Sequence, residues 1–371
     1  MKIKLSFSVL SFILCLSLFG CRVSIDSGMD SEQNSVTQQV CHDYVDSYGR
    51  VEFESPCDAY NPLTGNSDMA RDRVGMRAFA VDINNIYTCW PQYGISQADI
   101  LYEFLTEGGI TRFMAVFSDV RDVPRIGSVR SLRNSAMDGI YQLDPIVVHC
   151  GIGGAKADEF LRHYAVRTVS SDFCPSGFWR DKIREQTYSP EHCLFTSGRL
   201  INNALIELPL IKHETTNPPQ YSAFNFAKGN NERILLTDGS AKNIKCCLTG
   251  YAYLEYVYDS TTGKYLRSEF GEPQTDANSG AQLAFDNVFV LYYTPNNDRA
   301  NRFCFVDDFA KHEQGYYFSN GTYQHITWSK QEPKRGFVFL TDSGDELVVN
   351  KGTTCISLAQ NEYIDKMEIT D

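Results

Sequence analysis

The pattern of apolar residues changes near residue 217, and this change constrains the fold more than any other feature of the sequence. Before it, the short apolar runs AFAVDI (78–83), RFMAVFS (112–118) and PIVVHCG (145–151) alternate with stretches of helical period. Buried strands with helix-length connections pair in parallel, because a parallel neighbour needs a crossover. Residues 76–217 therefore predict an α/β domain with a mainly parallel or mixed sheet.

Three stretches of this half predict helices: 96–109, 131–143 and 155–166. In the first, Ser96 and Asp99 have the spacing of a capping box, apolar residues recur on one face, and a glycine pair ends the pattern. Ligand crevices in α/β folds lie at the carboxyl ends of the strands. We therefore expect any site of this half to lie in the loops that follow its strands.

Beyond a Pro-Pro step that predicts a hinge, apolar and polar residues alternate, and glycine-containing turns interrupt them. The stretches 253–270, 316–329 and 336–350 each predict a β-hairpin. Residues 218–360 therefore predict a mostly antiparallel β domain, followed by a tail at 361–371. The fold class predicted for the whole chain is α+β.

The amino terminus has the form of a secretory signal, with two lysines before an apolar run that is shorter than a membrane-spanning helix. Cys21 completes a sequence that resembles the bacterial lipobox, although Phe19 stands where a small residue is usual. We expect residues 1–20 to be a signal peptide and a diacylglyceryl group on Cys21 to anchor the chain to the outer face of the cell membrane. A plain secreted or uncleaved form is the alternative. Residues 21–75 are expected to form a flexible spacer and an irregular lead-in.

The chain is acidic, with a formal net charge of −12 that becomes −14 once the two lysines of the leader are removed. Nucleic acid would be repelled by a body of this charge, so it is excluded as a partner. Any anion that the protein binds must therefore lie in a local basic pocket.

Cysteines are frequent: of 12 in the chain, ten remain when Cys15 of the leader and Cys21 are set aside. In an oxidising compartment an even number permits disulfides, and Cys41 with Cys57 is the expected local pair. The adjacent Cys246 and Cys247 are not expected to bond to each other. Since neither C-x-x-C nor H-E-x-x-H occurs, we expect no metal site and no cofactor.

Several stretches of both halves resemble the YerB-like lipoproteins of Gram-positive bacteria, a family built from two domains of unknown function. They include WPQYGISQADILYEFLTEGGITRFMAVF (90–117), IGSVRSLR (126–133), VVHCGIGGAKA (147–157), FWRDK (178–182), YDSTTGKYLRSEFGEPQTDANSGAQLAFDNVFVLY (258–292) and YYFSNGTYQHITWSK (316–330). The resemblance implies an envelope-anchored protein and supplies no reaction. In SPEHCLFTS (189–197), His192 matches the family pattern, whereas Cys193 stands where the family tends to carry an asparagine.

The stretch PRIGSVRSLR (124–133) places Arg125, Arg130 and Arg133 between a predicted strand and a predicted helix. These arginines either pair with acids of the same half or bind a carboxylate or phosphate together with backbone N–H groups at the helix start. The candidate internal acids are Asp82, Asp99, Glu103 and Glu107. Three guanidinium groups on one short loop exceed what one buried acid can satisfy, which favours a ligand.

Glycines in HCGIGGA offer a second place where the backbone could approach an anion, at Gly153 and Gly154. A tight turn between strand and helix is the alternative. The stretch is not a dinucleotide-binding motif, because Lys156 occupies the third glycine position.

Two histidines lie in stretches that match the family, and each could act as a general base at neutral pH: His149 and His192. A histidine held by ordinary hydrogen bonds is the alternative for both. Arg180 of FWRDK adds a positive charge close to His192 in sequence, and an exposed helical face explains that charge equally well.

Three functions fit these observations. The first is an envelope lipoprotein without catalytic activity that binds an anionic envelope ligand, such as a peptidoglycan fragment, or a cell-wall partner protein. The second is an envelope enzyme that acts on phosphate or glycan linkages with the arginines and a histidine. The third is a scaffold alone. Because no G-x-S-x-G, S-x-x-K or paired-carboxylate motif occurs, the sequence favours the first function.

Overall fold

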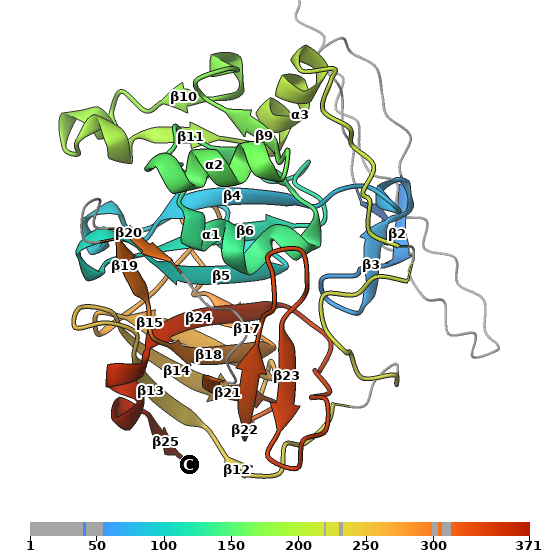
Figure 1. The fold of residues 1–371 in the computed structure, drawn as a ribbon, viewed down its shortest axis with the longest axis vertical. Coiled ribbons are helices and arrows are strands. Elements are labelled where there is room, and N and C mark those ends of the chain that lie inside the picture. Colours follow the sequence, from blue (N-terminus) through green and yellow to red (C-terminus); the bar gives the residue numbers. More distant parts are fainter. Residues whose placement is uncertain (1–39, 42–54, 219, 230–232, 299–302, 306–312) are drawn as a thin grey trace, which may run out of the picture. The chain divides into compact units, whose positions relative to one another are not determined.

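Strands dominate the structure, a computed structural model that describes residues 40–41, 55–218, 220–229, 233–298, 303–305 and 313–371 (Figure 1). The predicted signal peptide, Cys21 and the spacer up to residue 39 lie outside the described residues. The largest sheet has 11 strands and draws them from both halves of the sequence. In spatial order they are β12 (Gly239–Ser240), β22 (Thr322–Ser329), β21 (Glu313–Ser319), β18 (Asn287–Tyr293), β24 (Thr354–Gln360), β5 (Ile100–Leu105), β6 (Thr111–Phe117), β4 (Phe79–Asn84), β8 (Ile146–His149) and β9 (Arg167–Ser170), with β23 (Val338–Thr341) paired to β22.

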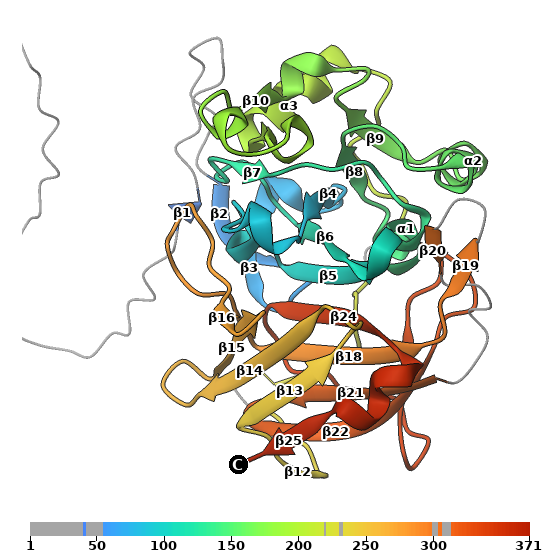
Figure 2. The same cartoon turned by 90° about the vertical axis from the view of Figure 1, so that its left-hand side faces the viewer.

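A second, antiparallel sheet packs on one face of this large sheet (Figure 2). It contains β16 (Glu272–Pro273), β15 (Lys264–Glu269), β14 (Tyr253–Asp259), β13 (Asn243–Cys247) and β25 (Glu368–Thr370), with β17 (Ala284–Phe285) beside β15. Tyr256 and Tyr265 of the second sheet share a core with Val288 and Val290 of β18. The second half is therefore β-rich, as the sequence predicts.

Short elements complete the described residues. The remaining strands are β1 (Val40–Cys41), β2 (Ser55–Tyr60), β3 (Ser67–Ala70), β7 (Ile126–Gly127), β10 (Trp179–Arg180), β11 (Leu194–Thr196), β19 (Asn296–Asp298) and β20 (Phe303–Phe305). The α-helices are α1 (Asn134–Ile140), α2 (Ala155–His163) and α3 (Gly198–Glu207). The 3-10 helices are η1 (Arg71–Arg73), η2 (Tyr87–Cys89), η3 (Ile95–Gln97), η4 (Glu107–Gly109), η5 (Tyr141–Leu143), η6 (Pro175–Gly177), η7 (Arg184–Gln186), η8 (Pro190–His192) and η9 (Asn361–Lys366).

The first half contributes a mixed sheet, which is one of the two arrangements that the sequence predicts. Strand β8 pairs in parallel with β4 and β9, whereas β6 pairs antiparallel with β4 and β5. Alternate residues of β4 serve two cores, because successive side chains of a strand point to opposite faces. Val81 packs in the core that includes Ile201 of α3, and Ala80 packs in the core that includes Met137 of α1.

The predicted helix at 96–109 is wrong, because this stretch contains β5. All six residues of β5 are buried, and a strand buried on both faces gives an apolar run that periodicity cannot distinguish from a helix. Ser96 caps no helix: its N–H and hydroxyl both donate to Asp276 Oδ2 at 2.8 Å. Asp99 instead accepts from the N–H of Ser118 at 2.6 Å.

Smaller differences concern the ends of elements. The helix expected from Ser131 begins at Asn134, so Arg133 is its N-cap and has an extended backbone. The stretch 361–371, predicted as a tail, forms η9 and β25, because β25 pairs with the edge strand β13. Part of the lead-in predicted as irregular forms the paired strands β2 and β3.

Strand β24 joins the two halves of the large sheet. It comes from the end of the chain and lies parallel both to β18 of the second half and to β5 of the first. Its insertion leaves no sheet edge between the halves, so the pairing of either half depends on residues of the other.

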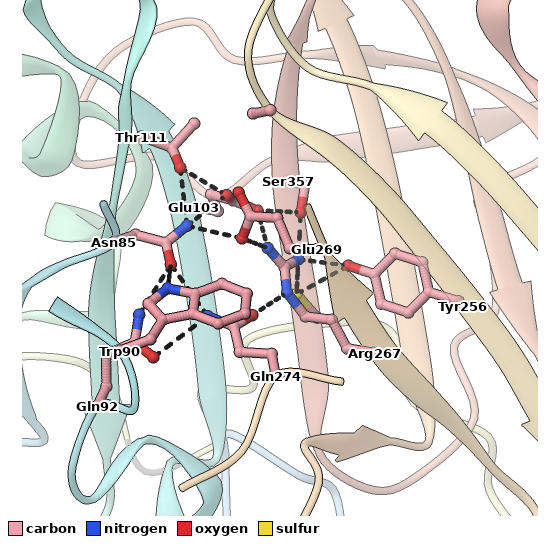
Figure 3. Close-up of polar contacts among 12 residues, drawn as sticks. Asn85, Trp90, Gln92, Glu103, Thr111, Tyr256, Arg267, Glu269, Gln274 and Ser357 are labelled. Carbon is pink, nitrogen blue, oxygen red and sulfur yellow. Dashed lines mark hydrogen bonds and ion pairs between the residues drawn. The ribbon is translucent and has the colours of Figure 1, made fainter. Parts of the chain in front are cut away.

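A buried polar network lies where β5 faces the second sheet, and its central groups are Glu103, Arg267 and Glu269, each 0% exposed (Figure 3). Arg267 Nη2 lies 2.9 Å from Glu269 Oε2 and 3.0 Å from Glu103 Oε2. The other Arg267 nitrogens donate to Gln274 Oε1 at 2.6 Å and to the Tyr256 hydroxyl at 2.7 Å. One guanidinium therefore holds carboxylates from both halves of the chain.

Neutral side chains complete the network. Asn85 Nδ2 donates to Glu103 Oε1 at 3.1 Å and to Glu269 Oε2 at 3.0 Å, and Ser357 Oγ donates to Glu103 Oε2 at 2.9 Å. Burial raises the pKa of Glu269, and the neighbouring Glu103 carboxylate raises it further, while Arg267 opposes both effects. Glu269 therefore keeps its proton to a higher pH than a free glutamate does.

Replacing Arg267 with methionine should destabilise the chain by roughly 3–5 kcal/mol, because two buried carboxyl groups would lose the cation between them. The free energy of unfolding, measured by urea titration at neutral pH, gives this value. Combining Arg267→Met with Glu103→Gln and Glu269→Gln should recover part of the loss.

The matched control is Arg335→Met, since the Arg335 side chain is 66% exposed and pairs with Glu332 at 3.2 Å. It should cost less than about 1 kcal/mol. An Arg267→Met chain as stable as the wild type would contradict the role given to the network.

Candidate functional site

The carboxyl end of β4 carries a cluster of polar side chains that we call the Arg130 site: Asp82, Asn84, Arg112, Arg130 and His192. Strand β8 pairs with β4 only as far as Val81, and beyond that point the segment 128–130 lies beside β4. Asn84 N donates to Ser128 O at 3.0 Å, and Arg130 N donates to Asp82 O at 2.9 Å. Asp82 and Asn84 belong to β4 and Arg112 to β6, whereas Arg130 and His192 come from connecting segments.

Arg130 and His192 are in direct contact. Arg130 Nη1 donates to the carbonyl of Glu191 at 2.6 Å and to His192 Nδ1 at 3.1 Å, and Asn84 Nδ2 lies 2.8 Å from the same Nδ1. Burial lowers the pKa of His192, and the adjacent Arg130 lowers it further. Because Nδ1 faces two donors, we assign the proton of the neutral ring to Nε2.

The charge of Arg130 is not neutralised by a neighbour. Among the described residues, the hydrogen-bond partners of its guanidinium are the Glu191 carbonyl and the His192 ring, and no carboxylate lies within ion-pair distance. Arg184 adds a second cation close to His192, since its Nε donates to the His192 carbonyl at 3.3 Å.

Asp82 is a fully buried acid beneath these arginines. Its closest cation is Arg112, whose Nη1 lies 3.8 Å from Oδ1, and neither oxygen has a hydrogen-bond partner among the described residues. Burial raises the pKa of Asp82 to about 6, and Arg112, Arg133 and Arg130 oppose this shift. Burial also lowers the pKa of Arg112 to about 10.

Arg133 pairs with an acid of its own half, as one of the two alternatives from the sequence predicts. Its Nε donates to Glu107 Oε1 at 2.7 Å and its Nη1 to the Ser131 carbonyl at 2.9 Å. The guanidinium lies against Gly153, where an added Cβ would come within 1.8 Å of Nη1. Gly153 therefore makes room for Arg133. Gly154, with φ of 93°, is the N-cap of α2.

Arg125 lies apart from Arg130, although only five residues separate them. Its guanidinium carbon lies 3.7 Å from the centre of the Phe195 ring and 4.0 Å from that of Tyr93, and its Nη2 donates to Asp181 Oδ2 at 2.6 Å. These contacts give Arg125 a local partner of opposite charge. Arg180 donates to the carbonyl of Pro190.

His149, the second candidate base, is buried at the end of β8. Its Nδ1 donates to the Gly151 carbonyl at 2.8 Å, and its Nε2 has no hydrogen-bond partner among the described residues. Burial lowers the pKa of His149, so the ring is neutral at neutral pH.

Two residues of this region were not predicted from the sequence: Asn84 and Arg112. Arg112 opens the apolar run of β6, and a charged residue at the start of a buried strand was the signal available for it. Arg184 belongs to a charged stretch that predicts an exposed helical face, whereas the structure has η7 there.

The free cysteines of the described residues are Cys89, Cys150, Cys174, Cys193, Cys246, Cys247 and Cys355. Cys246 and Cys247 are thus not bonded to each other. Burial raises the pKa of Cys193, which lies in the loop before β11. The pairing of Cys41 with Cys57 stays a prediction, because the side chain of Cys41 lies outside the described residues.

Metal-ligating side chains do not gather in groups of three or more anywhere in the described residues. Likewise, among the helices of these residues, none is long and apolar enough to cross a membrane.

Comparisons with known proteins agree with this architecture. Two family models match: "Protein of unknown function (DUF3048)", N-terminal domain, at residues 63–209, and its C-terminal domain at residues 244–356. A protein of Bacillus subtilis (strain 168) named YerB, and described as a candidate lipoprotein, is 31% identical over 233 residues, which make up 62% of this chain and 66% of that protein, just under two thirds of its length. The crystal structure of the YerB protein from Bacillus subtilis matches with a TM-score of 0.68 at 28% identity, over 84% of this chain and 99% of that one. The resemblance seen in the sequence is confirmed: the chain belongs to the DUF3048 family of proteins of unknown function.

Proposed function

We propose that this chain is a lipid-anchored protein on the outer face of the cell membrane that binds a phosphate or carboxylate group of an envelope polymer at the Arg130 site. The observation that carries the proposal is the guanidinium of Arg130, which no described carboxylate neutralises and which lies 3.1 Å from a neutral His192. The remaining N–H groups of Arg130 are the donors offered to an anion, whereas His192 Nε2 lies 3.8 Å from Glu191 Oε1.

The local charge supports this proposal. The cations of the Arg130 site and its surroundings are Arg112, Arg130, Arg133 and Arg184, and the acids are Asp82, Glu107 and Glu191, whose Oε1 lies 3.8 Å from His192 Nε2. Glu107 is paired with Arg133 at 2.7 Å, and the carboxyl of Asp82 lies beneath the site. Positive charge is therefore in excess here, although the whole chain carries −12.

His192 is not placed for proton transfer through Nδ1. A general base needs a free lone pair, and the lone pair of Nδ1 faces donors from both Asn84 and Arg130. The other ring nitrogen carries the proton and acts as a hydrogen-bond donor.

The expected location brings such polymers within reach. The leader and Cys21 predict export and lipid attachment. The related protein from Bacillus subtilis is itself described as a candidate lipoprotein.

Replacing Arg130 with glutamine should weaken binding of a poly(glycerol phosphate) chain by roughly tenfold to a hundredfold, because charge-assisted hydrogen bonds would be lost. Calorimetry with the full chain in detergent measures the affinity. Arg71→Gln is the matched control, since Arg71 is exposed and pairs with Asp58, and its affinity should be unchanged. Equal affinity of the wild type and Arg130→Gln would exclude the site, and no binding at all would favour the scaffold.

The affinity for the same polymer should rise as the pH falls from about 7.5 to about 5, since its phosphodiesters stay ionised in this range. Asp82, whose pKa is about 6, loses its negative charge on protonation, and His192, whose pKa is lowered, gains a positive charge only at the acidic end. Asp82→Asn should bind more tightly at neutral pH and lose most of this rise, whereas Asp365→Asn at an exposed position should behave as the wild type. An Asp82→Asn chain with the full pH dependence would contradict the assignment.

Replacing Cys21 with serine should move the chain from the membrane fraction to the soluble fraction and abolish labelling with radioactive palmitate. Cys15→Ser, within the apolar run of the leader, is the control and should leave both unchanged. If the Cys21→Ser chain stays with the membrane, an uncleaved leader holds it there.

A further inference from the structure

A cavity of about 330 Å³ lies at the amino ends of β8 and β9, whereas the Arg130 site lies beyond the carboxyl end of β4. We call it the Arg167 cavity, and its charged and aromatic lining residues are Arg77, Tyr141, Asp144, Tyr164, Arg167 and Lys334. We propose that it binds a second ligand, a phosphorylated small molecule of about monosaccharide size. Its volume is at the small end of the range of about 300–1,000 Å³ for ligand pockets.

The charges of the lining favour an anion. The lining has three cations, Arg77, Arg167 and Lys334, and one acid, Asp144. The carboxylate of Asp144 already has hydrogen-bond partners within the chain. Its side chain contacts Arg77 Nη1 and accepts from the N–H of Thr216 at 2.6 Å and from the Thr215 and Thr216 hydroxyls at 2.9 Å each. Asp144 therefore holds Arg77 in place and leaves the other two cations without a counter-ion.

Arg167 and Lys334 have no ion-pair partner among the described residues. Arg167 Nη1 donates to the carbonyl of Ala165, and Lys334 Nζ lies 5.7 Å from the centre of the Tyr164 ring. Glu332, close by in sequence, pairs with Arg335 at 3.2 Å. Two positive charges thus meet at the cavity without an acid of their own.

Unused hydrogen-bond donors point to the same conclusion. The Nε atoms of Arg77 and Arg167 are both buried and have no acceptor among the described residues. Arg77 as a whole is only 5% exposed. Buried donors without acceptors are rare in folded proteins, and both of these belong to arginines that line the cavity.

The backbone around the cavity is also unusual. Asp144, with φ of 52°, and Ala165, with φ of 47°, are two of the four non-glycine residues with positive φ in the described part of the chain. Such conformations cost free energy and gather at ligand sites. At both positions the turn presents a polar group to a lining arginine: Asp144 contacts Arg77, and the carbonyl of Ala165 contacts Arg167.

Phosphate matches this set of donors better than other small anions do. Guanidinium groups present several N–H donors in a fixed plane, which suits the oxygens of phosphate, and lysine adds a point charge. The Tyr141 and Tyr164 rings supply an apolar wall for the ring of a sugar. The inference is independent of the proposed function, because it uses no residue of the Arg130 site.

The test is calorimetry on the full chain with N-acetylglucosamine 1-phosphate, inorganic phosphate and uncharged N-acetylglucosamine. We expect the sugar phosphate to bind more tightly than phosphate, and the uncharged sugar not to bind. Arg167→Ala with Lys334→Ala should weaken the sugar phosphate at least about tenfold, because both unpaired charges are removed. Lys242→Ala with Lys366→Ala removes an equal charge at exposed positions elsewhere and should leave the affinity unchanged.

Two further measurements keep the result decisive. Thermal unfolding should show the Arg167→Ala, Lys334→Ala chain folded, since neither side chain has a partner of opposite charge to lose. Arg130→Gln should retain the binding of the sugar phosphate in full. Binding that survives in the double variant, binding lost in Arg130→Gln, or no binding of any phosphate would each overturn the assignment of this cavity.

Discussion

The ion pairs that Arg267 makes with Glu103 and Glu269 are the constraint on which the rest of the structure depends. All three groups are 0% exposed, and buried charges are tolerated only when they are paired and their remaining bonds are satisfied. Glu103 belongs to the first half of the chain and Arg267 with Glu269 to the second, so Glu103 takes its buried ion-pair partner from the other half. Together with β24, which lies between β18 and β5, the network makes the folding of the two family regions interdependent.

Both proposed ligand sites depend on this shared sheet. Arg130 lies beside the carboxyl end of β4 because β8 stops pairing at Val81 and leaves an edge for the segment 128–130. The Arg167 cavity lies at the amino ends of β8 and β9, and Lys334 reaches it from the second half. The cavity therefore receives cations from both halves of the chain. Of its two cations without an ion-pair partner, Arg167 belongs to the first half and Lys334 to the second.

Local pattern predicts the short apolar runs that form buried strands, and it fails at β5, where a residue that resembles a helix cap precedes the run and a glycine pair follows it. Strands β4, β6 and β8 and helix α2 lie where the sequence predicts them. The sequence predicts a helix at β5 because Ser96 and Asp99 have the spacing of a capping box, whereas the partner of Ser96 in the structure is Asp276, 180 residues away. The network was beyond prediction for the same reason. Arg267 meets Glu103 across a distance in sequence that no local pattern encodes.

The three arginines of 124–133 show why spacing in sequence cannot separate a structural cation from a binding one. Arg125 lies against the Phe195 and Tyr93 rings and pairs with Asp181, and Arg133 pairs with Glu107. Arg130 stands beside a strand whose facing acid, Asp82, is buried and has its pKa raised to about 6, and it meets a carbonyl and a neutral imidazole instead of a carboxylate. The chain has 46 acidic residues against 34 basic ones, so acids are not scarce, and an arginine left without one reflects its position in the fold. Arg130 is therefore the residue of the three suited to hold an outside anion, because no carboxylate of the described residues neutralises its charge. The number of arginines in the loop does not decide this.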